Sequence, residues 1–148
     1  MRFLKPYIFY PNKDDETTYS KINEQWNKYN IHLKKNKDKI DKSLFELYQR
    51  TDRFHDYKIL EIIYEFKDVN HMIVSVRMED CYRKTEYRMT FNGVCSFQMK
   101  SEDFAELEDI VLCEIGITKG INYLSLYLIS GHEIEICFKD MFFISSNV

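Results

Sequence analysis

The sequence predicts an α+β protein in which two N-terminal helices pack on an antiparallel sheet, or sandwich-like meander, of about six strands. Hydrophobic residues before Phe54-His55-Asp56 recur every three or four positions, as in helices, whereas those after it alternate with polar residues, as in strands. Short connections without intervening helices favour antiparallel pairing of these strands. We therefore expect residues 1–148 to form a single domain, with a helical part at about 14–53 and a β part at about 57–145.

The helical part contains two amphipathic segments. The acidic stretch at 14–16 supplies an N-cap and negative charge for the positive end of a first helix. Its apolar stripe consists of Tyr19, Ile22, Trp26, Tyr29 and Leu33. Two heptads are too few for a coiled coil, so we expect this stripe to pack on the protein's own sheet. A second, shorter helix is predicted to begin with a capping-box pattern from Ser43 to Glu46.

From residue 57 the hydrophobic period becomes two. The apolar face of the first two strands is expected to contain Leu60, Ile62, Tyr64, Phe66, Met72, Val74, Val76 and Met78. A third strand ends at Asn92-Gly93, a pair that tolerates positive φ and favours a tight two-residue turn into a strand at 94–99. Further strands are predicted at 110–115, 122–129 and 132–138.

Composition and motifs exclude several classes of function. A formal charge of −3 argues against a protein that grips nucleic acid through its phosphates. No apolar run reaches 18 residues and the first residues are too polar for a signal peptide, so we expect a cytoplasmic protein that does not bind membranes. The four cysteines lie 14, 18 and 24 residues apart without a CxxC pair, which indicates neither a zinc ribbon nor a redox motif. We predict no cofactor and no catalytic set.

The pair His55-Asp56 is the strongest chemical candidate in the sequence. A histidine beside a carboxylate can act as a general base or supply two metal ligands, so a metal-dependent hydrolase that uses His55 and Asp56 is an alternative function. The pair stands at the beginning of a strand rather than on a helix among other ligands. We favour a structural role, in which Asp56 turns the chain and His55 bonds to nearby backbone.

A group of carboxylates is the better candidate for a binding surface. It consists of Glu102, Asp103, Glu106, Glu108, Asp109 and Glu114. Carboxylates gathered in one connection can attract a basic protein and accelerate its encounter with this chain.

The segment Phe54-His55-Asp56-Tyr57-Lys58-Ile59 resembles a group of small uncharacterised bacterial proteins. In these, a helical lead-in precedes a hydrophobic-His-Asp-x-x-Ile entrance to a β domain; Trp26-Asn27-Lys28-Tyr29, Ser43-Leu44-Phe45-Glu46-Leu47 and Ile134-Glu135-Ile136 are similar to other parts of the group's sequences. Similar proteins with this entrance occur among immunity proteins of bacterial toxin systems, which cover a toxin's active site. The resemblance implies a non-enzymatic protein whose partner is another protein, such as a basic toxin domain. A self-associating structural protein, a homo-oligomer built through aromatic-rich edges and the Trp26 stripe, is a further alternative.

Overall fold

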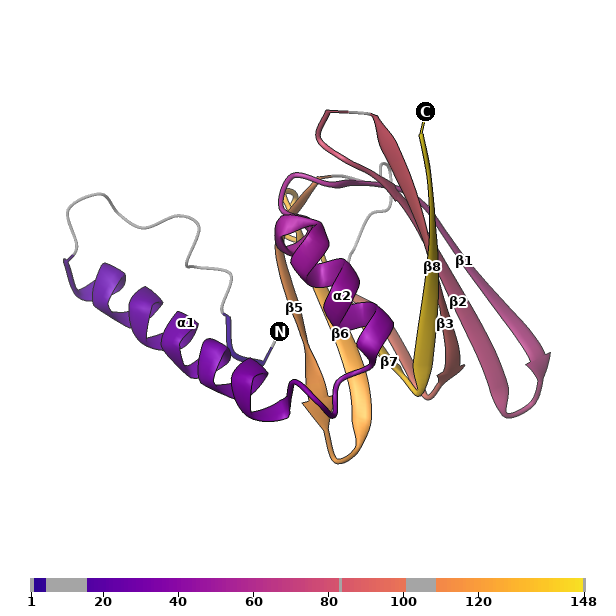
Figure 1. Ribbon diagram of the computed structural model, residues 1–148, viewed down its shortest axis with the longest axis horizontal. Helices are drawn as coiled ribbons and strands as arrows, with labels where there is room; N and C mark the ends of the chain where they lie inside the picture. The colour runs from indigo at the N-terminus through magenta and orange to yellow at the C-terminus, as the bar shows by residue number, and fades with distance from the viewer. Residues whose placement is uncertain (1, 5–15, 83, 101–108, 148) are drawn as a thin grey trace.

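The computed structural model describes residues 2–4, 16–82, 84–100 and 109–147 and confirms the α+β class. Two helices precede eight strands, which form two antiparallel four-stranded sheets with the orders β1-β2-β3-β8 and β4-β7-β6-β5 (Figure 1). The elements are α1 (Glu16–Asn36), α2 (Lys42–Arg50), a 3-10 turn (Asp52–Phe54), β1 (Lys58–Asp68), β2 (His71–Glu79), β3 (Thr85–Val94), β4 (Ser96–Lys100), β5 (Ile110–Thr118), β6 (Ile121–Leu128), β7 (Glu133–Phe138) and β8 (Asp140–Asn147).

The two sheets are joined because two strands pass from one sheet into the other. β3 continues after Cys95 as β4, and β7 continues after Lys139 as β8; β3 pairs with β8, and β4 pairs with β7. These four strands therefore form one antiparallel ribbon that bends across both sheets. The Cys95 N–H donates to the Cys137 carbonyl at 2.9 Å, and the Lys139 N–H donates to the Asn92 carbonyl at 3.1 Å, which holds the ribbon together at the bend.

The prediction of a two-residue hairpin turn at Asn92-Gly93 is wrong. Gly93 does have a positive φ of 57°, but it lies inside β3 at a bulge, where the pairing with β2 shifts. Bulges of this kind bend strands and let them change sheets. A Cβ on Gly93 would lie 3.0 Å from the Cβ of Lys139, so the close approach of the segment between β7 and β8 also favours glycine here.

Helix α2 lies where the two sheets meet and contacts both β8 and β5. The capping-box pattern predicted Ser43 as the N-cap of α2, but the N-cap is Asp41. Asp41 Oδ1 accepts the Leu44 N–H at 3.0 Å. Asp41 Oδ2 also accepts the Met141 N–H at 3.3 Å, which ties the beginning of α2 to β8.

The alternation predicted for β2 and β3 is confirmed. The fully buried core side chains include Leu44, Leu47, Tyr48, Val74, Val76, Met78, Met89, Phe91, Leu124, Leu126, Ile136 and Phe138.

Two tyrosines connect the helices to the outer edge of β5. The Tyr29 hydroxyl accepts the Ile115 N–H at 2.8 Å and donates to the Ile115 carbonyl at 3.2 Å. The Tyr48 hydroxyl donates to the Cys113 carbonyl at 3.4 Å. Burial raises the pKa of both tyrosines, so they stay protonated and able to donate. The α1 stripe therefore packs on the protein's own sheet, as expected, although only its later part is buried.

β1 does not have the single buried apolar face that the sequence predicted. Its pairing with β2 shifts between Ile59 and Glu61, so Leu60 is an extra residue at a bulge. Farther along, Tyr64 and Phe66 are on the core side of the sheet but are 61% and 68% exposed. Figure 1 shows why: the β1–β2 hairpin projects beyond the strands of the second sheet.

Within the described residues, neither helix is long and apolar enough to span a bilayer.

Candidate functional site

Of the acidic group predicted as a binding surface, the structure describes Asp109 and Glu114, and these two do not share a surface. Asp109 is exposed and forms a backbone bridge to Lys58 at the beginning of β1. Glu114 is fully buried on β5, so its assignment to an exposed acidic surface is corrected. Glu102, Asp103, Glu106 and Glu108 lie outside the described residues.

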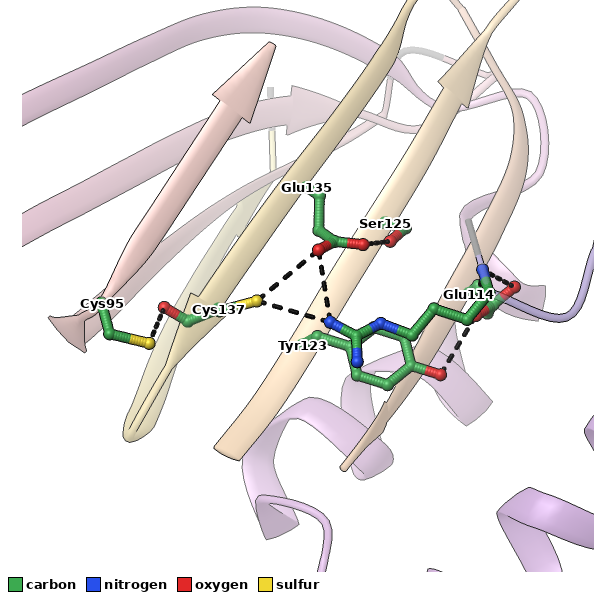
Figure 2. A network of polar contacts seen from close by, with 7 residues as sticks. Cys95, Glu114, Tyr123, Ser125, Glu135 and Cys137 are labelled. Atoms are coloured by element: carbon green, nitrogen blue, oxygen red, sulfur yellow. Dashed lines mark hydrogen bonds and ion pairs between the residues drawn. The ribbon is translucent and has the colours of Figure 1, made fainter. Parts of the chain in front are cut away.

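Glu114 is the centre of a buried polar network instead (Figure 2). Its carboxylate accepts the backbone N–H groups of Arg2, Phe3 and Leu4, each at 3.0 Å, and the Tyr123 hydroxyl at 3.0 Å. Three consecutive N–H donors that converge on one carboxylate form an anion-binding arrangement of the kind found at helix N-termini and backbone nests. Here it fixes the segment 2–4 on the outer face of the second sheet.

The Arg2 side chain extends the network across β6 and β7. Its guanidinium lies 4.1 Å from the centre of the Tyr123 ring and 3.3 Å from Glu135 Oε1. Glu135 also accepts the Ser125 hydroxyl at 3.1 Å, and Arg2 donates to the sulfur of Cys137 at 3.7 Å. Burial alone would raise the pKa of Glu135, but the Arg2 charge and the Ser125 hydrogen bond outweigh it and hold that pKa below its usual value.

The network supports binding of a backbone segment better than it supports catalysis. Burial raises the pKa of the Cys137 thiol and of the Tyr123 hydroxyl, so neither is a ready nucleophile or base at neutral pH. His32 lies beside the network, with its ring 4.6 Å from that of Phe3, and burial lowers its pKa. Its buried Nε2 makes no hydrogen bond to any described residue.

No pattern in the sequence indicated Arg2 or His32 as functional residues, and Glu114 was predicted to lie among exposed carboxylates. One signal for Glu114 was available. It interrupts an otherwise apolar segment, residues 110–117, that is buried on both faces of the sheet. A lone carboxylate in such a strand must be paired or hydrogen-bonded when it is buried.

His55 and Asp56 do lie together, with Nδ1 and Oδ2 2.8 Å apart, but both side chains are more than half exposed. Among the described residues, no three His, Cys, Asp or Glu side chains are grouped closely enough to hold a metal ion. Asp56 has a φ of 63°, so it does turn the chain, as predicted.

The segment before this pair is strained. Asp52, Arg53 and Phe54 all have φ between 47° and 63°, a left-handed conformation that costs about 1–2 kcal/mol per residue. Full burial of Phe54 against Tyr48 and Tyr57 offsets part of this cost. The turn borders a depression of about 280 Å³ that is lined by Trp26, Asp52, Arg53, His55, Val111, Leu112 and Cys113. The Arg53 guanidinium lies 5.1 Å from the centre of the Trp26 ring. The positive charge of Arg53 at this depression is therefore engaged in a cation–π contact within the protein.

An exposed apolar surface is a further candidate that the sequence pattern did not indicate. We call it the hairpin patch and define it as Tyr64, Phe66 and Val69 of the β1–β2 hairpin with Phe97 of β4. Tyr64, Phe66 and Val69 are 61%, 68% and 96% exposed. The Tyr64 and Phe97 rings are 6.1 Å apart, so the patch reaches from one sheet to the other. The alternation that marks these residues as core-facing says nothing of how far the second sheet extends over them.

Comparison with known proteins adds no relative: no family model, no curated protein and no solved structure matches this chain.

Proposed function

We propose that this protein is a non-enzymatic binding protein that neutralises a bacterial toxin domain by covering it. The observation that carries the proposal is the hairpin patch. Large aromatic side chains that stay exposed together in a folded protein mark interaction sites. Their burial against a partner removes apolar surface from water, which favours binding. The resemblance to immunity proteins at the His55-Asp56 segment supplies the kind of partner.

The patch has the features of a binding anchor. Tyr64 is held against Phe97, so part of its conformational entropy is already lost before a partner arrives. Phe66 lies two residues farther along the same face of β1 and exposes more of its side chain. Aromatic residues of this kind are the ones that most often dominate the energy of protein interfaces.

The net negative charge of the chain favours a basic partner. Asp68 is exposed at the end of the same hairpin, beside the exposed Lys67, whereas Glu65 is exposed on the opposite face of β1. The Asn70 N–H and the neighbouring His71 hold the pKa of Asp68 below its usual value, so this carboxylate is ionised at neutral pH. β4, which contributes Phe97, is followed in sequence by the carboxylates at 102–108. A net charge of −3, with an ionised Asp68 at the end of the hairpin, would steer a basic toxin domain toward this protein.

The experiment uses the purified product of the gene immediately upstream, because immunity proteins tend to follow their toxins. Calorimetry should show binding, and the double variant Tyr64→Ser, Phe66→Ser should weaken it by about a hundredfold, since two aromatic anchors each contribute roughly 1–2 kcal/mol or more. Ile63→Ser is the matched control, because Ile63 is exposed on the opposite face of the same strand. Absence of binding at micromolar concentration, or equal binding by the double variant and the control, would contradict the proposal.

A further inference from the structure

The two sheets have four outer strands, and the structure protects three of them from edge-to-edge pairing. The hydroxyls of Tyr29 and Tyr48 bond to the outer edge of β5. β4 has only five residues. β1 contains a bulge at Leu60 and the charged residues Glu61, Glu65, Lys67 and Asp68. Short length, charge, bulges and covering groups are the usual means by which proteins prevent pairing at sheet edges.

Within the part of the chain that the structure describes, β8 has none of these protections beyond its first two residues. The stretch Met141-Phe142-Phe143-Ile144-Ser145-Ser146-Asn147 has no charge, no proline and no shift in its pairing with β3. Phe142 and Ile144 are 52% and 61% exposed, on the face of the sheet that lies away from the core. α2 reaches this edge at Met141, through Asp41.

The hydrogen bond from Met141 also fixes which backbone groups of β8 are available. Since Met141 directs its N–H away from β3 and toward Asp41, alternate residues along the strand direct theirs to the same side. The N–H and C=O groups of Phe143 and Ser145 therefore face the free edge. Among the described residues, β8 has a strand partner on one side only, which is β3.

We propose that β8 pairs antiparallel with β8 of a second copy of this chain, with the two-fold axis at Ile144. In this register Phe143 of each copy exchanges hydrogen bonds with Ser145 of the other, and all four groups are those that the free edge presents. The two Ile144 side chains then meet across the axis as a non-hydrogen-bonded pair, the closer of the two kinds of antiparallel pair. The result is a continuous eight-stranded sheet with a closed two-fold interface.

A second copy fits this edge better than a different protein does. An antiparallel pair of identical strands sets one strand against a copy of itself, so like charges on it would lie close together and repel. The uncharged residues from Met141 to Asn147 avoid that repulsion. β1 lies at the opposite edge of the same sheet, so dimerisation leaves the hairpin patch of each copy open. The dimer would present two patches.

The test measures the mass of the full chain by sedimentation equilibrium across the micromolar range. The wild-type protein should approach twice the 18.0 kDa chain mass as its concentration rises. Ile144→Lys and Ile144→Glu should each sediment as monomers, because like charges would meet on the axis, with the dissociation constant raised by at least about tenfold. An equimolar mixture of the two variants should recover a dimer that contains one of each. Recovery also shows that both variants fold.

Ser145→Pro is a second variant that acts on the backbone. Its missing N–H faces the free edge, where proline is tolerated in a strand, so the monomer should keep its fold while the dimer is lost. Ile63→Lys is the control, since it adds the same charge to the same face at the opposite edge and should leave the dimer intact. A wild-type protein that stays monomeric, or a dimer that survives both Ile144→Lys and Ser145→Pro, would overturn the proposal.

Discussion

Removal of the Glu114 carboxylate should detach the N-terminal segment from the second sheet. In Glu114→Ala, the N–H groups of Arg2, Phe3 and Leu4 and the Tyr123 hydroxyl lose a shared acceptor. If the segment stayed in place, each donor left buried and unbonded would cost about 1–3 kcal/mol. If it detached, water would satisfy the donors, but the fully buried Leu4 would be exposed at a cost of about 1.5–3 kcal/mol.

Detachment is the less costly response, since it replaces several buried unbonded donors by one exposed apolar side chain. Removal of a buried charge returns part of the loss, so we expect the free energy of unfolding in urea to fall by about 2–4 kcal/mol. The amide protons of Phe3 and Leu4 should lose their protection from hydrogen exchange, while those of the core strands keep theirs. Glu114→Gln retains one acceptor and should lie between the wild type and Glu114→Ala. A change below about 1 kcal/mol together with unchanged exchange at Leu4 would refute this reasoning.

Three further changes test other parts of the structure. Asp41→Ala should destabilise the protein by about 1 kcal/mol in thermal unfolding because α2 loses its N-cap, whereas Ser43→Ala should have a much smaller effect. A larger effect of Ser43→Ala would instead support the capping box that the sequence predicted. Gly116→Ala should cost about 1–3 kcal/mol, since the new Cβ would lie 2.7 Å from His32 Nε2 and from the Tyr123 hydroxyl; an unchanged melting temperature would show that these side chains move aside. Glu135 has a lowered pKa in the folded protein, so its ionised form stabilises the fold above its ordinary pKa near 4.5, and that contribution is lost as the pH falls through the folded value. The stability difference between the wild type and Glu135→Gln should therefore shrink in acid, and a difference that stays constant down to the acid transition would contradict the assignment.

Local patterns in the sequence determined the class of the fold. The change of period near residue 55 reflects backbone geometry, because a helix returns to the same face every 3.6 residues and a strand every two. The same rule identified the buried faces of β2 and β3, and the later buried part of α1. The two helices followed from it, and the antiparallel pairing followed from the short connections between the strands.

Tertiary structure alone decided where the ribbon bends, what covers each face and which polar groups meet. Asn92-Gly93 has the local preference of a hairpin turn, but the competing strands β7 and β8 make the same glycine a bulge between two sheets. Likewise, alternation marked Tyr64 and Phe66 as core residues, yet their exposure depends on how far a distant strand extends. Glu114 meets the N–H groups of residues 2–4 across more than one hundred positions of sequence. Periodicity is a property of neighbouring residues, whereas these contacts depend on the relative positions of segments far apart in the chain, which no local pattern encodes.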